Sequence, residues 1–374
     1  MVHLNHFIKQ HTAFIGAVMI ASSSFAFGQP LALFNHFDQN NPYHFSLKYN
    51  NANDALALKN IAQYKWDEGY SPREGNNIAI INHRVDMGLT IDSWYLGYAL
   101  RYDMFVKTDK STTDILQLTN TKQTLPLGRY YDIYLEAHGI ASHNLILSKT
   151  FYIGNNLKFF VGGALIHAFG VQEGFVDAYA NITSDKAYDF EGFSQYYYDT
   201  NNLYTLDVTQ PKGYGYSLNF GLNYTHNKHS FTFLAQDFAS RIYWQNIPYS
   251  EVLIISDKKE YDKNGYIKYK PSISGYELYK DYTQELETKY LLEYQYQYQD
   301  NLDAKLALGY QNNYLLPFVA LRYHHNEHIN YSLGYEGRFG QISLAMEFYD
   351  FKASIASNHI SHPTALSLHL SYSF

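Results

Sequence analysis

The chain has 374 residues, a hydrophobic fraction of 46%, a charged fraction of 17% and a formal net charge of −7 at pH 7. It contains no cysteine, which excludes disulfides, thiolate catalysis and Cys-zinc sites. The acidic balance gives no reason to expect a nucleic-acid partner. The unusual feature of the composition is its 39 tyrosines and 24 phenylalanines beside only 3 tryptophans.

Residues 1–28 are typical of a secretory signal peptide. Lys9 precedes an apolar run over residues 13–21, and small residues follow that run. This order of charge, apolar centre and small residues predicts cleavage after Ala26 or after Gly28. No later stretch has 18 consecutive apolar residues, so the sequence predicts no membrane-spanning helix.

Residues 29–53 leave two alternatives open. They form either a first strand around residues 43–49 or a short plug. From residue 54 onward the dominant signal is a period of two, clearest over residues 214–225. There the apolar or aromatic residues are Tyr214, Tyr216, Leu218, Phe220, Leu222 and Tyr224, and every residue between them is small or polar.

This alternation places apolar and polar side chains on opposite faces of a strand. Several of the alternating segments run for ten or more residues, which is longer than most soluble strands and long enough to cross a bilayer when tilted. The pattern therefore favours a membrane barrel over a soluble sandwich.

The C-terminal strand carries the most specific pattern. Apolar residues occupy every second position up to the last residue: Leu366, Leu368, Leu370, Tyr372 and Phe374. In this respect the sequence resembles the outer-membrane β-barrel (porin-like) proteins of Gram-negative bacteria. The resemblance implies that these five residues are read by the barrel-assembly machinery, and that the chain lies in the lipid bilayer of the outer membrane.

The alternating segments predict an all-β fold, a transmembrane antiparallel up-and-down β-barrel over residues 54–374 with about 16 strands, or 14 as the alternative. The candidate strands are 54–65, 77–91, 94–107, 129–139, 144–153, 157–168, 171–180, 213–225, 230–243, 265–280, 286–299, 302–310, 314–323, 328–337, 341–353 and 364–374. With the C-terminus in the periplasm, this count puts turns 311–313 and 338–340 inside. It puts the turn that holds His324, His325, Glu327 and His328 outside.

The polar faces of these strands are expected to line the lumen. The candidate lining residues are Arg84, Asp86, Arg101, Asp103, Asp132, Glu136, Glu293, Asp303, Lys305, Glu336 and Glu347. Eight carboxylates against three basic groups predict a weak preference for cations. The alternative is that these charges pair with one another inside a plugged barrel, as Arg84 with Asp86 and Arg101 with Asp103 could.

No motif favours an enzyme. His369 and Ser371 are similar only in letters to the His-x-Ser pair of barrel lipid A deacylases, and the sequence places no acid nearby. His324, His325, Glu327 and His328 crowd one turn, and His359 and His362 lie in the next outer loop. A cation site needs several such ligands to converge, and a polar turn with ordinary imidazoles is the favoured interpretation. We therefore expect a porin-like channel for passive diffusion of small solutes, without cofactor or metal. The alternative is a non-channel barrel whose outer loops act in adhesion, partner binding or surface assembly.

Overall fold

The structure is a computed structural model, and it describes residues 31, 33–38, 42–63, 66, 69–185, 187–200, 208–255, 259–261, 267–269 and 272–373. The predicted signal peptide and Phe374 lie outside these residues. Among them, no helix is both long enough and apolar enough to span a membrane. The helical elements are short: η1 (His36–Asp38), α2 (Leu58–Gln63) and α3 (Lys110–Asn120).

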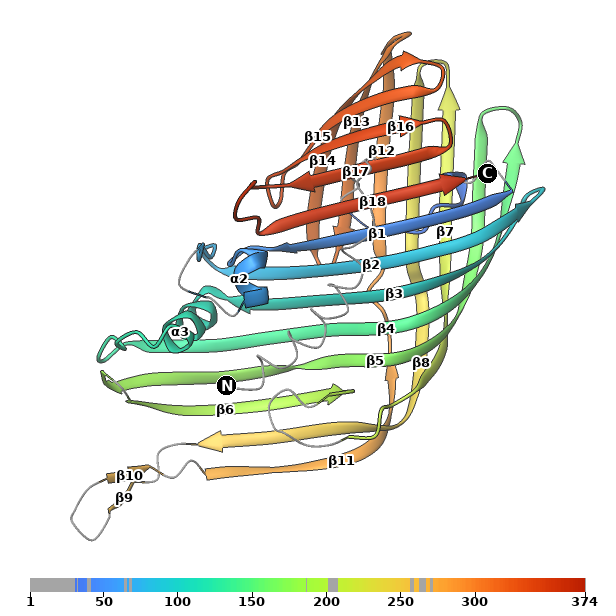
Figure 1. The fold of residues 1–374 in the computed structure, drawn as a ribbon. Helices are drawn as coiled ribbons and strands as arrows, with labels where there is room; N and C mark the ends of the chain where they lie inside the picture. The colour runs from blue at the N-terminus through green and yellow to red at the C-terminus, as the bar shows by residue number, and fades with distance from the viewer. Residues whose placement is uncertain are drawn as a thin grey trace.

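Antiparallel strands form nearly all of the remaining structure (Figure 1). They are β1 (Tyr43–Asn53), β2 (Asn76–Ile91), β3 (Trp94–Asp109), β4 (Tyr130–Ile153), β5 (Leu157–Ser184), β6 (Ala187–Tyr198), β7 (Gly213–His226), β8 (His229–Ile255), β9 (Lys259–Tyr261), β10 (Ile267–Tyr269), β11 (Ser272–Gln284), β12 (Lys289–Gln299), β13 (Leu302–Gln311), β14 (Tyr314–Asn326), β15 (Ile329–Glu336), β16 (Gln341–Phe348), β17 (Phe351–Ser357) and β18 (Ala365–Ser373).

The sheet closes into a barrel because β1 pairs with both β2 and β18. The circuit runs from β1 to β5, through β7 and β8 to β12, and then in chain order to β18. This makes 14 strands, so the alternative count is confirmed and the count of 16 is wrong. Two further strands, β6 and β11, lie outside the circuit: each pairs with β8 beyond the point where β7 or β12 ends.

Several misread segments explain the wrong count. The candidate strand 265–280 falls on β10 and β11, which lie outside the circuit. The candidate strand 54–65 contains the helix α2, and the first strand is β1. The candidates 129–139 and 144–153 are one strand, β4, and 157–168 and 171–180 are one strand, β5. In contrast, the candidate 341–353 is a hairpin of β16 and β17 that turns at Tyr349, where φ is +52°.

The hairpin at Tyr349 reverses the predicted side of several turns. All the described turns at the end of the barrel that holds Tyr43 and Ser373 are very short: 92–93, 154–156, 227–228, 300–301, 327–328 and 349–350. We call this the short-turn end. The opposite end, the long-loop end, holds the connections 54–75, 110–129 and 358–364, together with turns 312–313 and 337–340.

Short turns are typical of the periplasmic end of a bacterial barrel and long loops of the outer end. The histidine-rich turn therefore lies at the inner end, and turns 311–313 and 338–340 lie at the outer end, opposite to the prediction. His359 and His362 are at the other end from His324. Among the residues that the structure describes, no three His, Asp or Glu side chains are grouped so that they could hold a metal ion.

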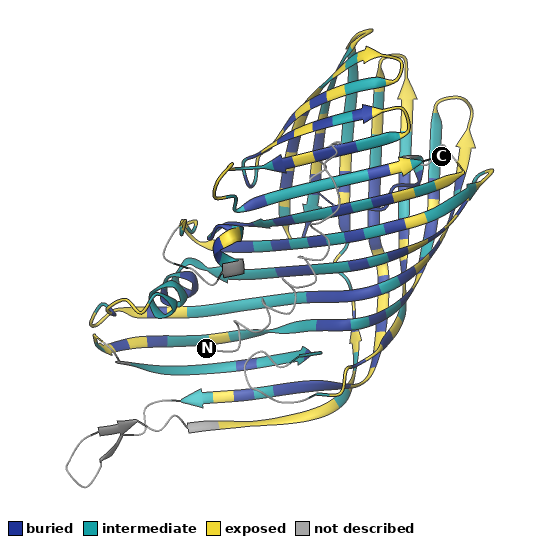
Figure 2. Cartoon of the chain, in the orientation of Figure 1, coloured by how far each residue is buried: buried dark blue, intermediate teal, exposed yellow. Residues whose placement is uncertain are grey.

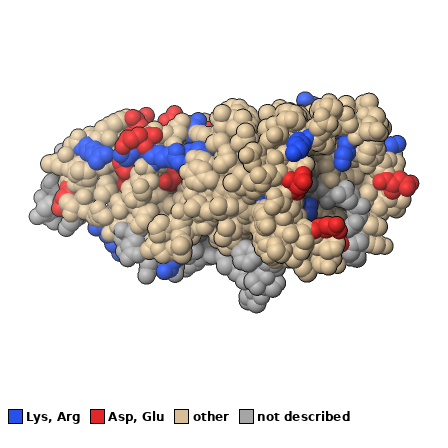
Figure 3. Space-filling model, turned by 90° about the horizontal axis from the view of Figure 1, so that it is seen from above, with Lys and Arg blue, Asp and Glu red and all other residues tan. Residues whose placement is uncertain are grey.

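The outer face of the barrel is apolar at mid-height. Leu321, Leu333 and Leu344 stand opposite one another on β14, β15 and β16, and each is more than half exposed. Aromatic side chains are exposed nearer the two ends: Trp94, Phe151, Tyr224, Phe231, Tyr323, Tyr331 and Tyr372 towards the short turns, and Tyr214, Tyr243, Tyr290 and Tyr335 towards the long loops. In the view of Figure 3, charged side chains gather towards the two ends, and the middle is uncharged.

An apolar band between two aromatic girdles is the surface that a bilayer requires. Leu333→Arg should therefore lower the free energy of unfolding by about 2–4 kcal/mol, because a guanidinium would be placed near the bilayer midplane. Unfolding of the refolded barrel in lipid vesicles by urea measures this loss.

The matched control is Thr232→Arg. Thr232 faces the lumen opposite Glu293, and both side chains line a water-accessible cavity, so the new charge stays hydrated. We expect the control to cost much less than Leu333→Arg. Equal costs for the two variants would mean that the Leu333 face does not meet lipid.

We call the aromatic residues exposed towards the long loops the outer girdle. One wall of the barrel continues beyond it. β4, β5 and β8 have 24, 28 and 27 residues, whereas β13, β15 and β16 have 10, 8 and 8. The extra length forms a curved sheet of β2–β6, β8 and β11 at the long-loop end (Figures 1 and 2). The helix α3 packs on its outer face, where Ile115 is buried beside Tyr131 and Ile182.

Candidate functional site

The lumen holds the segment just before β1. We call residues 31 and 33–38 the plug. Leu31, Leu33 and Phe34 have almost no exposed surface, although they belong to no strand. The Phe34 ring lies 5.3 Å from the ring of Tyr95 and 5.8 Å from the ring of Phe160, both of which face inward from the barrel wall. The core of this barrel is therefore packed around its own N-terminal segment.

Hydrogen bonds fix the plug to three strands. The backbone N–H of Phe34 donates to Oε1 of Gln236 on β8 at 2.9 Å. The ammonium group of Lys48 on β1 donates to the carbonyl oxygen of Leu33. Nδ1 of His36 is 2.9 Å from the Ser148 hydroxyl on β4. Because these bonds reach separated parts of the wall, the plug has one defined position across the lumen.

Beside the plug, buried charges connect strands that are not neighbours in the sheet. The guanidinium of Arg101 on β3 donates to both carboxylate oxygens of Asp237 on β8, at 3.1 and 2.6 Å. Arg101 also contacts Asp103 at 2.5 Å, and Asp103 accepts from the ammonium of Lys289 on β12 at 2.7 Å. We call Arg101, Asp103, Asp237 and Lys289 the constriction.

A β-bulge brings Asp237 into this position. The register between β7 and β8 shifts between Leu218 and Asn219, and Asp237 adopts φ of +60°. Its backbone N–H donates to the Asn219 side chain, and its carboxylate accepts from the Ser217 hydroxyl at 2.6 Å. A positive φ is rare outside glycine, and Asp tolerates it better than most residues. The bulge turns a side chain inward that regular alternation would place elsewhere.

The connection 285–288 between β11 and β12 lies next to the constriction, on the side of the long-loop end. Gln284, at the end of β11, donates to the carbonyl oxygen of Gly139 at 3.2 Å and to Glu173 at 2.8 Å on the opposing wall. Leu286 exchanges two hydrogen bonds with Ser240. The Gln284 side chain therefore links the start of this connection to the opposing wall, while the connection itself follows β8 and leaves Glu285 and Glu287 exposed.

Two sets of cavities lie on either side of this closed level. On the outer side, cavities of about 280 and 100 Å³ share His138 and Glu173 in their walls. The larger one is aromatic, with Tyr134, Phe175, Tyr197 and Tyr282 around it. On the inner side, one polar cavity of about 290 Å³ is lined by the plug and by strands from both walls.

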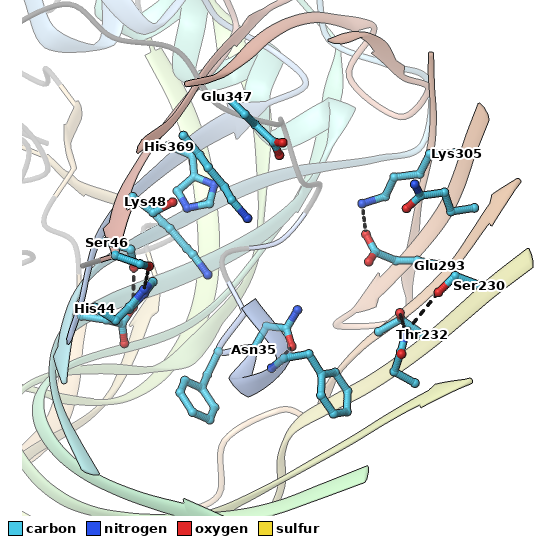
Figure 4. Close-up of a pocket in the computed structure, with 18 of the residues that line it drawn as sticks. Asn35, His44, Ser46, Lys48, Ser230, Thr232, Glu293, Lys305, Glu347 and His369 are labelled. Atoms are coloured by element: carbon cyan, nitrogen blue, oxygen red, sulfur yellow. Dashed lines mark hydrogen bonds and ion pairs between the residues drawn. The ribbon is translucent and has the colours of Figure 1, made fainter. Parts of the chain in front are cut away.

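Figure 4 shows the inner cavity. Lys48 and His369 approach it from one side, and Glu293 and Lys305, which form an ion pair, from the other. Asn35 reaches it from the plug. Arg322 and Glu347 also line it and pair with each other. This cavity is a water-accessible vestibule whose floor is the plug.

At the outer cavities, His138 is held between two carboxylates. Its Nδ1 lies 2.6 Å from Glu173 and its Nε2 lies 3.0 Å from Glu136. This part of β4 is beyond the outer girdle. The hydrogen bond with Glu173, helped by the bond with Glu136 and by the charges of both groups, raises the pKa of His138 to about 9 against desolvation. The imidazole is therefore charged at neutral pH.

The predicted lining residues occupy different levels of the barrel. Arg101 and Asp103 belong to the constriction, and Arg84 and Asp86 form a buried ion pair at 2.7 Å on β2. Glu293, Lys305 and Glu347 line the inner cavity, and Glu136 lines the outer one. Asp303 accepts from Gln295 at 2.7 Å and lies 2.9 Å from Nε2 of His324, and Asp132 is exposed on β4 towards the long loops.

Glu336 has a different position from the one expected of a selectivity residue. Its carboxylate accepts the backbone N–H of Arg338 at 2.7 Å and of Phe339 at 2.9 Å. It therefore caps the turn between β15 and β16 at the long-loop end. Neutralising Glu336 would act first on that turn.

The sequence interpretation omitted several charged residues. Basic side chains that line the lumen cavities beyond the three expected ones are Lys48, Lys158, Lys289, Arg322 and Lys352. The additional acids are Glu173, Asp237, Glu285 and Glu287. The predicted excess of eight carboxylates over three basic groups therefore does not describe this lumen. A preference for cations along its whole length loses its basis.

A closed antiparallel barrel with an apolar outer band, aromatic girdles and a polar interior defines a transmembrane β-barrel of the outer-membrane class. The fold expected from the C-terminal strand and the alternating segments is thus confirmed. The residues of the C-terminal pattern up to Tyr372 lie on β18, beside β1 and β17.

The chain matches no family model and no curated protein. Among solved structures it is similar to the toluene transporter TodX of Pseudomonas putida, at 10% identity and a TM-score of 0.45 over 94% of this chain and 96% of that one. It is also similar to the toluene transporter TbuX of Ralstonia pickettii, at 9% identity and a TM-score of 0.35 over 90% of each chain. At 8% identity and a TM-score of 0.25 it is similar to the outer-membrane protease OmpT of Escherichia coli, over 92% of this chain and the whole of that one. At these values the likeness carries no argument about function.

Proposed function

We propose that the chain is an outer-membrane channel for passive diffusion of small solutes, and that it opens when the plug is displaced. The observation that supports this function is the division of the lumen. Water-accessible cavities lie on both sides of one closed level, and that level consists of a strand-free segment and polar contacts. A barrel of this size is too wide to be filled by its wall side chains alone.

The conductance of the purified protein in a planar bilayer tests the function. Deleting residues 31–38 should raise the single-channel conductance or the fraction of time spent open, because the deletion removes the aromatic core that spans the lumen. The full chain should show small or rare currents under the same conditions.

A second variant keeps the test valid if the deletion prevents folding. The chain has no cysteine, so His36→Cys with Ser148→Cys introduces one reactive pair at a contact between plug and wall. Bridging the pair with a short reducible cross-linker should abolish openings, and reduction should restore them. Openings that persist at the same rate after cross-linking would contradict passage through the plug level.

The rival function is a barrel that stays closed and binds a partner through its outer surface. The bonds of the constriction between non-neighbouring strands favour it, and so do the exposed tyrosines of β11, such as Tyr276 and Tyr279, on the wall beyond the outer girdle. If neither the full chain nor the plug variants conduct, this rival becomes the better function.

A further inference from the structure

The cavities on the two sides of the constriction differ in the sign of their charge. On the inner side the basic residues of the lining are Lys48, Lys158, Lys305, Arg322 and Lys352. The carboxylates of the same lining are Asp86, Glu293 and Glu347. Among the described residues, neither Lys158 nor Lys352 has an ion-pair partner. The inner vestibule is thus net basic at neutral pH.

The outer cavities have the opposite balance. Apart from the constriction, their carboxylates are Glu136, Glu173, Glu285 and Glu287. The only basic group in the same described lining is His138. Lys107 and Arg241, which lie outside this lining, contact Glu136 at 3.7 Å and Glu285 at 3.3 Å. Arg241 is on the outward face of β8 beside Tyr216 and Tyr243, so its exposed pair with Glu285 does not contribute to the lumen charge. The remaining carboxylates, Glu136, Glu173 and Glu287, still exceed Lys107 and His138 by one.

We propose that the lumen is a bipolar pore, with an acidic outer half and a basic inner half, and that it therefore conducts ions better in one direction of the field than in the other. This inference rests on the proposed channel function. An acidic half accumulates cations and a basic half accumulates anions, and low-dielectric walls strengthen both effects.

The polarity that gives the larger current follows from the half of the pore through which each kind of ion enters. When the outer compartment is positive, cations enter through the acidic half and anions enter through the basic half. Both kinds of ion then accumulate at the constriction, and the current is large. When the outer compartment is negative, both kinds of ion are drawn away from the constriction, and the current falls.

The bipolar pore also defines the class of solute that fits it. A small zwitterion can place its ammonium group in the acidic half and its carboxylate in the basic half at the same time. A solute with a single charge is favoured in one half and opposed in the other. We therefore expect zwitterions to cross faster than anions or cations of similar size.

The experiment measures current at equal and opposite voltages in symmetric salt. It uses the full chain and the variant without residues 31–38. Labelling of the variant Lys122→Cys, at the long-loop end, with an impermeant thiol reagent shows which side of the bilayer the long loops face. At about 0.1 M salt the current with the outer side positive should exceed the reverse current by about twofold or more, and at about 1 M salt the ratio should approach one, because the Debye length falls from about 10 to about 3 Å.

Neutral variants assign the effect to the two halves. Lys158→Gln with Lys352→Gln, and separately Glu287→Gln, should each bring the ratio closer to one. The matched control Lys59→Gln, exposed on α2, should leave the ratio unchanged. Open channels with equal currents in both directions would overturn the bipolar pore but leave the channel function standing. No current from either protein would overturn both.

Discussion

Replacing Arg101 with leucine should lower the free energy of unfolding by about 3–5 kcal/mol, which is the usual cost of leaving a buried carboxylate without its partner. Arg101 is 5% exposed and holds Asp237, which is 2% exposed, through two hydrogen bonds. Asp103 keeps Lys289 when Arg101 is lost, so the cost arises mainly at Asp237. Urea unfolding of the refolded barrel in lipid vesicles measures it.

The double variant Arg101→Leu with Asp237→Asn separates charge from packing. Asparagine tolerates the positive φ at position 237 and removes the unpaired charge. We expect the double variant to recover a large part of the lost stability. If it is as unstable as Arg101→Leu alone, the loss comes from packing and not from an uncompensated carboxylate.

The second prediction concerns pH and the contact of His138 with Glu173 and Glu136. The folded-state pKa of His138 is raised to about 9, above its ordinary value of 6.5. The stabilisation from this contact is therefore fully present below about pH 6.5 and is lost as the pH rises through about 9. The side chain is one-third exposed, so we expect a contribution of roughly 1–2 kcal/mol.

The comparison is between the full chain and His138→Gln, each unfolded by urea at about pH 6 and about pH 10. The stability difference between the two proteins should be large at the lower pH and should shrink at the higher one. Other groups titrate in both proteins alike, so they cancel in this difference. A difference that does not change with pH would show that His138 acts through packing alone.

Alternation predicted the direction of side chains well wherever strands are regular. On β3, Trp94, Leu96 and Tyr98 are exposed outside the barrel, and Arg101 is buried inside it. Alternation did not predict the strand boundaries where the two-residue period is interrupted or continues through a turn. The bulge on β5 opposite Ala141 and Ser142 interrupts the alternation of β5, so this long strand gives the pattern of two. The turn at Tyr349 lacks glycine, proline and asparagine, so two strands were read as one.

The constriction could be predicted only in part. Arg101 and Asp103 are two residues apart on one polar face, which is a local pattern. Asp237 and Lys289 are joined to them by closure of the barrel, and no spacing along the chain records that contact. The sequence still held a signal: Gln236 and Asp237 interrupt an apolar stretch of β8. The plug was an open alternative because its apolar residues show no period.

The short distance along the chain between the plug and β1 limits where the plug can go. Asp38 and Tyr43 are five residues apart, and Tyr43 is anchored at the short-turn end. A chain of this length reaches at most about 17 Å when fully extended. A displaced plug therefore stays beside the inner mouth as a tethered blocker. Its return is intramolecular, at an effective concentration in the millimolar range, so the rate of reclosing should not depend on how much protein the membrane contains.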